Sequence, residues 1–179
     1  MNTCAFTGHR PSHFHFQYDE QHPDCLALKD CMRTEIMKLV ERGIMTFLSG
    51  MALGVDTWGA EIILELKPQH PRLKLIAVIP CETQANKWSD KQRERYFTLL
   101  AQCDEEIYVS RRYTRSCMFD RNRYLVNHSD ILLAIYDGDS KGGTAYTVRY
   151  AQEKKREVII IPAFACYPCI DINEFLVRE

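Results

Sequence analysis

Apolar runs rich in β-branched residues alternate with helical patterns along most of the chain, and this alternation constrains the fold more than any single motif. Six runs predict strands, at 4–8, 44–50, 73–80, 105–110, 131–138 and 157–162. The intervening segments predict helices at 24–42, 54–66, 89–102, 116–128 and 144–154, with a further short helix at 171–178. Strands that alternate with helices form a mostly parallel sheet covered by helices on both faces. We therefore expect a Rossmann-like α/β three-layer sandwich with the strand order 3-2-1-4-5-6.

Length, charge and cysteine usage narrow the class of protein. The chain has 179 residues, which suits a single domain over 1–179, and its formal net charge of -1 argues against a wholly basic nucleic-acid module. No signal-peptide pattern and no apolar run long enough to span a bilayer are present, so we expect a cytoplasmic protein with free thiols and no membrane partner. Cys166 and Cys169 form a lone CxxC pair, for which a turn at Pro168 is a simpler interpretation than a redox or zinc role.

Three glycine-containing segments follow predicted strands: TGHRP at 7–11, SGMALGVD at 49–56 and DGDSKGGTAYT at 137–147. Ligands of open parallel sheets bind beyond the carboxyl ends of the strands, so these segments are expected to share one edge. Glycine lets backbone amides approach an anion closely, and a helix N-terminus adds a favourable dipole. The GxGxxG fingerprint is absent after the first strand and GxxxxGK[ST] is absent throughout. The sequence therefore predicts a phosphate-bearing ligand, but neither an ordinary dehydrogenase nor a P-loop NTPase.

The side chains around these glycines suggest individual roles. Arg10 and Arg121 carry guanidinium groups suited to bidentate phosphate contacts. Asp56 either binds ribose hydroxyls or only stabilises the start of the second helix. Trp58 and Tyr146 either stack on a base or, as we favour for Trp58, pack in the core. The expected ligand-binding residues are Gly8, His9, Arg10, Ser49, Gly50, Gly54, Asp56, Arg121, Asn122, Gly142, Gly143 and Thr144.

Two other clusters have competing interpretations. His13 and His15 form an HxH pair, which lacks the third and fourth ligands of a zinc site, so we expect no metal site. The run RRYTRSCMFDRNRY at 111–124 places five arginines among aromatic side chains. This run is either a solvated loop and helix face or an anion funnel beside the ligand. Single-stranded nucleic acid would use the same residue types, with aromatic rings stacking on bases.

Two motifs carry a resemblance to a known superfamily. SGMALGVDTWGAE at 49–61 resembles the SG-x-A-x-G-[IV]-D segment of DprA-like DNA-processing proteins. MFDRNRYLVNHSDILLAIYDGDSKGGT at 118–144 resembles a segment of the LOG "lysine decarboxylase-like" proteins. Both belong to the SLOG superfamily of Rossmann-like nucleotide-binding domains. TGHRP, GVDTWGAE and RNRYLVNHSD together look most like its YpsA-like branch, and the resemblance covers residues 3–163.

The resemblance also implies roles and one departure. It implies that the loop 142–144 holds phosphate and that Arg121 matches the LOG arginine that takes part in cleaving the N-glycosidic bond of a nucleoside monophosphate. The LOG catalytic glutamate falls at Thr147 in this chain, and a hydroxyl does not replace a carboxylate in that chemistry. Catalytic residues therefore stay unassigned, and the weak candidates are Arg121, Asp56 and Glu82.

Three functions stay open. The favoured one is a sensor or regulatory module that binds a nucleotide or a derivative such as ADP-ribose, NAD or a nucleoside monophosphate, because it explains both the glycine loops and the missing glutamate. The second is a LOG-like nucleoside 5'-monophosphate phosphoribohydrolase, which requires another carboxylate, such as Asp56, Glu82 or Asp139. The third is DprA-like binding of single-stranded DNA. No further cofactor is implied, and the resemblance suggests a homo-oligomer.

Overall fold

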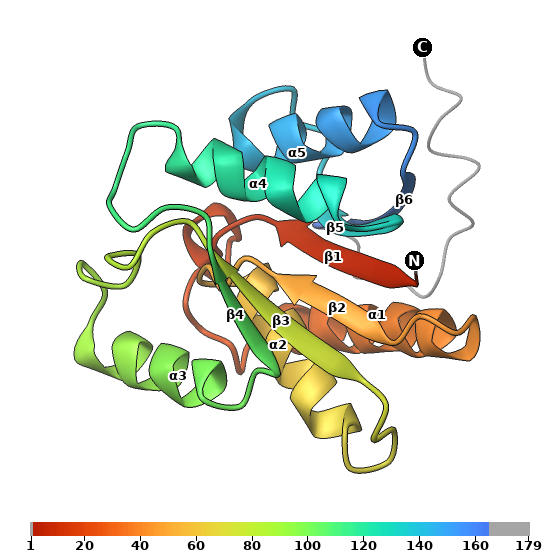
Figure 1. Cartoon of the computed structure of the whole chain (residues 1–179). Helices are drawn as coiled ribbons and strands as arrows, with labels where there is room; N and C mark the ends of the chain where they lie inside the picture. The colour runs from red at the N-terminus through yellow and green to blue at the C-terminus, as the bar shows by residue number, and fades with distance from the viewer. Residues whose placement is uncertain (1, 165–179) are drawn as a thin grey trace.

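The computed structural model describes residues 2–164 (Figure 1). The expected helix at 171–178 and the pair Cys166 and Cys169 lie outside this range. In chain order the described elements are β1 (Thr3–Gly8), the 3-10 turn η1 (Pro11–His13), α1 (Pro23–Glu41), β2 (Thr46–Ser49), α2 (Val55–Leu66), β3 (Lys74–Ile79), α3 (Asp90–Leu100), β4 (Glu105–Tyr108), α4 (Cys117–Asn127), β5 (Ile131–Tyr136), α5 (Gly142–Glu153) and β6 (Glu157–Pro162). Each predicted strand and helix within 2–164 is present, and η1 is an element that the sequence did not predict.

The strands form one all-parallel sheet in the order β4-β3-β2-β1-β5-β6. This confirms the Rossmann-like parallel sandwich, but the predicted order 3-2-1-4-5-6 is wrong. The fourth strand lies outside β3 at the edge of the sheet, and β5 takes the place beside β1. The alternation of strands and helices predicts parallel pairing. It does not predict how many strands the chain adds on one side of β1 before it crosses to the other side. The reversal after β4 makes the gap between β1 and β5 the topological switch point.

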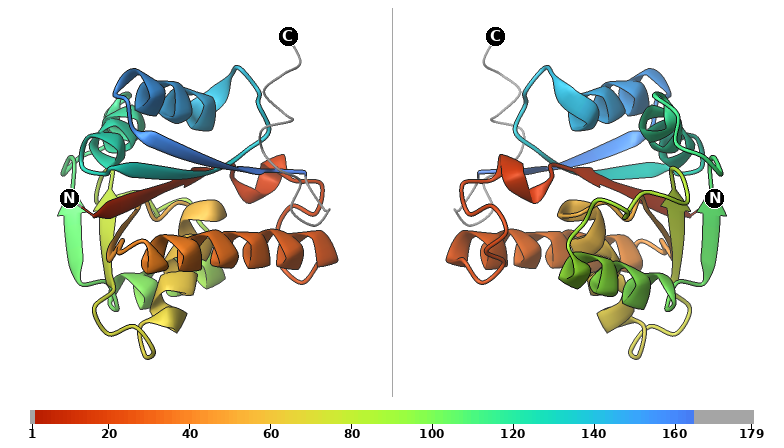
Figure 2. Two further views of the ribbon diagram at one scale, coloured as in Figure 1. Left: turned by 90° about the vertical axis from the view of Figure 1, so that its right-hand side faces the viewer. Right: turned by 90° about the vertical axis from the view of Figure 1, so that its left-hand side faces the viewer.

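Two helical layers enclose the sheet. α1, α2 and α3 cover one face, and α4 and α5 cover the other (Figure 1, Figure 2). Successive side chains of a strand point to opposite faces, so Phe6 packs in the core under α1 and α2, while its neighbour Ala5 packs in the core under α4 and α5. Among residues 2–164, none of the helices combines the length and the apolar character that crossing a bilayer demands.

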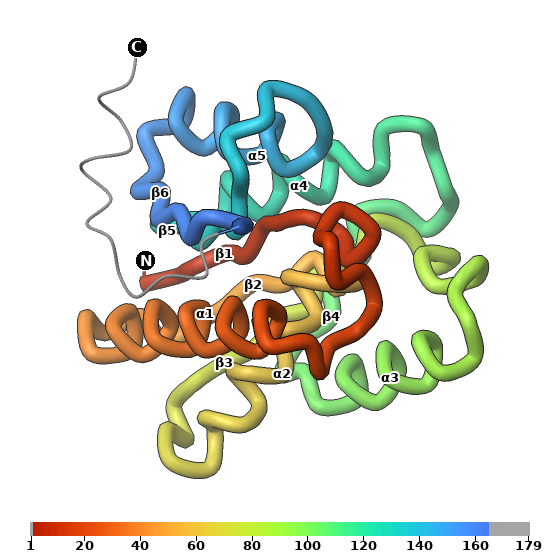
Figure 3. The backbone as a smooth tube through the Cα atoms, turned by 180° about the vertical axis from the view of Figure 1, so that it is seen from behind, coloured from red at the N-terminus to blue at the C-terminus, as the bar shows by residue number. Residues whose placement is uncertain are grey.

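The segment between β1 and α1 is long and well packed. It leaves the end of β1, forms η1 and winds back to the start of α1 (Figure 3). Phe14 and Phe16 are buried, and the ring of Phe14 lies 5.6 Å from that of Trp58. Trp58 is only 1% exposed. The structure therefore places Trp58 in the core, as favoured from the sequence. This packing holds the start of the segment, with His9 and Arg10, beside the end of the sheet.

Candidate functional site

A cavity of about 340 Å³ lies at the carboxyl edge of the sheet, bordered by the end of β1, by α2 and by the starts of α4 and α5. The structure brings most of the expected ligand-binding residues to its wall: Gly8, His9, Arg10, Asp56, Arg121, Asn122, Gly143 and Thr144. Ser49, Gly50, Gly54 and Gly142 do not line it. The shared location of the first group is observed, and ligand binding by these residues stays a prediction.

A buried ion pair forms one wall of the cavity. Arg121, on α4, donates from Nη1 to Oδ2 of Asp56, on α2, over 2.7 Å, and each side chain is only 8% exposed. The Nε of Arg121 is buried and has no hydrogen-bond partner among the described residues. Arg121 lines the cavity, and a guanidinium group in this position is suited to bind an incoming anion. Asp56 is thus a partner of Arg121 as well as a residue of the first turn of α2.

In the segment after β2, Ser49 and Gly50 support this ion pair and do not line the cavity. A Cβ atom at Gly50 would overlap with the guanidinium of Arg121 and lie 2.6 Å from Oδ2 of Asp56. The hydroxyl of Ser49 is fully buried, donates to the carbonyl of Asp56 and accepts from the amide of Met51. Gly54 has a φ of +92° at the N-terminus of α2, a conformation that favours glycine. The sequence predicted that this segment surrounds a phosphate. The observed contacts of Ser49 and Gly50 are with other protein atoms.

The start of α5 contributes backbone donors. Gly142 has a φ of +94°, and no side chain caps the helix. The first amides of an α-helix have no partner within the helix, and Gly143 and Thr144 line the cavity. The aligned peptide dipoles favour an anion at this end. The α5 N-terminus therefore has the features expected of a phosphate-binding loop.

Thr147, which occupies the place of the LOG glutamate, does not face the cavity. It is fully buried, and its hydroxyl donates to the carbonyl of Gly143 over 2.7 Å. Glu82 is exposed beyond β3 and does not line the cavity. Among the three weak catalytic candidates, the structure places Asp56 and Arg121 at the cavity and leaves Glu82 outside it.

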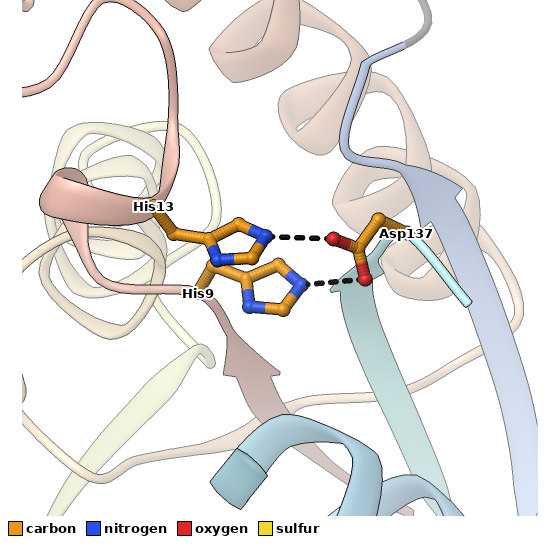
Figure 4. Close-up of side chains that lie close together, drawn as sticks. All are labelled: His9, His13 and Asp137. Carbon is orange, nitrogen blue, oxygen red and sulfur yellow. Dashed lines mark hydrogen bonds and ion pairs between the residues drawn. The ribbon is translucent and has the colours of Figure 1, made fainter. Parts of the chain in front are cut away.

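A second charged cluster borders the cavity at the switch point. Gly8 of β1 is in register with Ile135 of β5, so the residues after these strands lie side by side. Nε2 of His9 lies 3.1 Å from Oδ1 of Asp137, and Nε2 of His13 lies 2.6 Å from Oδ2 of the same carboxylate (Figure 4). The two imidazole rings stack with their centroids 3.7 Å apart. His9 and His13 also line the cavity.

The surroundings of this cluster shift the pKa values of His9 and Asp137. Burial, assisted by the neighbouring His13, lowers the pKa of His9, and Asp137 opposes this only in part. Burial would raise the pKa of Asp137, but the backbone amide of Asp139 and the two histidines lower it to about 2. At neutral pH the cluster therefore holds an ionised carboxylate beside a neutral His9.

The remaining candidates lie away from the cavity. Tyr146 packs edge-on against Phe119 and stacks on Tyr150 rather than lining the wall. The arginines at 111, 112 and 115 are exposed on the segment between β4 and α4. They offer positive charge to solvent, and none of them lines the cavity.

Comparison with known proteins shows the family of the chain. The model of the family YpsA, described as the YspA SLOG family, matches residues 4–161. The chain belongs to the YpsA SLOG family. It is 31% identical over 156 residues to a UPF0398 protein of Bacillus thuringiensis (strain Al Hakam), and 30% identical over the same length to one of Bacillus cereus (strain B4264). Each alignment covers 86% of this chain and 84% of the relative.

In this YpsA-family chain, two residues of the site were not predicted from the sequence. His13 was considered with His15, whereas the structure pairs it with His9 and Asp137. Asp137 was quoted only as part of a glycine loop. The signal that could have found them is the rule that neighbouring parallel strands end at one edge, combined with the switch point between β1 and β5.

Proposed function

We propose that this YpsA-family protein binds a nucleotide or a nucleotide-derived phosphate ligand, such as ADP-ribose, NAD or a nucleoside monophosphate, and acts as a sensor or regulatory module. The observation that carries the proposal is the buried guanidinium of Arg121, which keeps Nε free of partners among the described residues and lies at the wall of the cavity. Burying a hydrogen-bond donor without a partner costs free energy of folding. The position of Arg121 at the cavity wall places its positive charge beside an anionic ligand.

Three further features support the same ligand class. The uncapped start of α5 presents backbone amides to the cavity. Arg10 and Asn122 add a cationic and an amide side chain at the wall. The carboxylate of Asp56, which accepts from Arg121, faces the same space and is suited to accept hydrogen bonds from ribose hydroxyls. Phosphate and sugar recognition would thus share one cavity of about 340 Å³.

The test begins with the freshly purified protein. Native mass spectrometry would detect a nucleotide that copurifies, and a thermal-shift panel of AMP, ADP-ribose, NAD and short single-stranded DNA would rank the ligand classes. We expect a mononucleotide or dinucleotide to raise the melting temperature. Stabilisation by DNA alone, lost in high salt, would replace the proposal with DprA-like binding. No copurified nucleotide and no shift with any of these compounds would refute it.

A variant pair locates the binding site. Asn122→Asp places a negative charge on the cavity wall, where it repels phosphate, and we expect it to abolish the thermal shift. Asn86→Asp makes the same chemical change on an exposed residue outside the cavity and should leave the shift unaltered. Equal shifts in both variants would place the ligand elsewhere.

One observation favours a second candidate, the LOG-like phosphoribohydrolase. Thr147 supplies no carboxylate, but Asp56 brings one to the cavity next to Arg121. Such a carboxylate is suited to stabilise an oxocarbenium-like state or to activate water. Incubation with AMP followed by chromatography would detect free adenine. Hydrolysis by the parent protein that Asn122→Asp also loses would establish this enzyme activity, and intact AMP after long incubation would exclude it.

A further inference from the structure

The cluster of His9, His13 and Asp137 brings together three side chains that can each act as a metal ligand. One imidazole nitrogen of each histidine and one carboxylate oxygen of Asp137 lie within 4.8 Å of one another. Two segments of the chain contribute, the one that follows β1 and the one that follows β5. Both histidines direct the same ring nitrogen, Nε2, at a single carboxylate (Figure 4).

One of these nitrogens is without an aligned partner. The buried Nε2 of His9 makes no aligned hydrogen bond among the described residues, although Oδ1 of Asp137 lies 3.1 Å away. Buried polar atoms are rarely left so, and an unsatisfied one at a site is a sign of a missing partner such as an ion. The carboxylate is itself held by the backbone, because the amide of Asp139 donates to Oδ1 of Asp137 over 3.0 Å. Such outer hydrogen bonds are typical around metal ligands.

We propose that His9, His13 and Asp137 bind a divalent transition-metal ion of the zinc type at the edge of the cavity. Two neutral imidazoles and one carboxylate form a three-ligand set that Zn²⁺ accepts, with the remaining coordination position open to water or to another oxygen. The metal site stands on these three residues alone. That the open position receives a phosphate oxygen of the cavity ligand rests, in addition, on the proposed function.

Binding requires a small movement. The rings stack at an interplanar angle of 13°, so their nitrogen lone pairs run nearly parallel, and a shared ion requires the planes to turn until these lone pairs converge. His13 can make this turn, because it lies at the end of the three-residue η1 and its side chain is 35% exposed. His9 and Asp137, at 9% and 12% exposed, supply the fixed part of the site.

A second group, His15, His22 and Asp24, has three ligand atoms within the same distance limit and competes as an explanation. Its histidines are 55% and 37% exposed and do not line the cavity. It provides the matched comparison for the test.

The experiment measures metal binding by the full chain without nucleotide, so its outcome is independent of the proposed function. The protein is dialysed against Zn²⁺, its metal content is determined by mass spectrometry, and Co²⁺ is used as a spectroscopic probe. We expect one tightly held equivalent and a Co²⁺ absorption band. His13→Asn and Asp137→Asn should lose that equivalent, with affinity lowered more than about 100-fold.

Two controls make the assignment specific. Asp139→Asn removes a charge two residues from Asp137, and His22→Asn disrupts the competing group, and both should retain the metal. Circular dichroism of each variant monitors the fold. Loss of metal in His22→Asn with retention in His13→Asn would overturn the proposal, as would the absence of stoichiometric Zn²⁺ and Co²⁺ binding in the parent protein.

Discussion

Arg121 on α4 and Asp56 on α2 meet in a buried salt bridge of 2.7 Å above the end of the sheet. The two helices belong to opposite layers, since α2 covers one face of the sheet and α4 the other (Figure 1). The pair therefore joins the two layers at the cavity. Its charges are withdrawn from solvent, so each one depends on the other for stabilisation.

The effects of removing Arg121 and Asp56 should not add. Arg121→Gln or Asp56→Asn alone leaves an uncompensated buried charge, and we expect each to lower the free energy of unfolding by about 3 kcal/mol. The double variant should lose clearly less than the sum of the two single effects. Urea denaturation of the four proteins gives the coupling energy. Additive losses would show that the two side chains act independently.

Gly50 should tolerate no side chain. In Gly50→Ala the new methyl group overlaps with the guanidinium of Arg121, so the buried pair must shift, and we expect a loss of about 1–3 kcal/mol in unfolding free energy together with a weaker ligand response. Gly143→Ala is the matched control, because its added methyl group lies 3.8 Å from the nearest atom, Nδ2 of Asn122. Thermal melts of both variants test the comparison. Equal stability would contradict the close approach at Gly50.

Restoring the LOG glutamate should not create a hydrolase. Thr147→Glu forces a carboxylate into a fully buried position, and we expect it to destabilise the protein by about 3 kcal/mol or more without release of adenine from AMP. Thr147→Val removes only the hydroxyl that bonds to Gly143 and should cost about 1 kcal/mol. Denaturation and an assay of adenine release from AMP check both variants. A stable and active Thr147→Glu protein would show that this position reaches the ligand.

Acid should weaken the network around Glu20. Burial alone would raise the pKa of Glu20, but hydrogen bonds from Arg95 and Lys29 lower it from 4.5 to about 2. Because the folded-state pKa lies below the unfolded value, the stabilisation is fully present above pH 4.5 and is lost as the pH falls toward 2. Glu20→Gln should therefore cost about 2 kcal/mol at pH 7 and progressively less below pH 4.5.

Urea denaturation across this pH range tests the expectation. Glu153→Gln is the control, since Glu153 is an exposed residue of α5. It should show no pH-dependent difference from the parent protein. A constant difference between Glu20→Gln and the parent from pH 7 to pH 3 would rule out the shifted carboxylate as its cause.

The fold was largely predictable because its strands and its helices each leave a local pattern in the sequence. Strands such as Ile131–Tyr136 are buried on both faces and read as continuous apolar runs, and the helices keep their apolar spacing. The place of β4 was not predictable from such signals. Its residues are mostly exposed, as suits an edge strand, but its sequence does not state which edge it joins.

The site was predictable to the extent that it follows from strand ends. The rule that ligand loops gather at the carboxyl edge predicted that Gly8 and Gly143 lie close together, and both line the cavity. The rule gives no information about side-chain direction. Ser49 therefore was expected to face the ligand but bonds to Asp56 and Met51, and the approach of His13 to Asp137 was not anticipated.

The central position of β1 has a consequence for how the molecule is completed during synthesis. β1 is made first, yet its neighbour β5 follows only after most of the chain, and the amide of Thr3 donates to Asp130 across 127 positions. Pairing of β2, β3 and β4 joins segments that are adjacent in the sequence, whereas the meeting of β1 with β5 closes a very long loop. The cavity and the histidine cluster both require this long-range pairing, because residues after β1 and after β5 contribute to each. Any molecule held there joins the first and last thirds of the chain and opposes their separation.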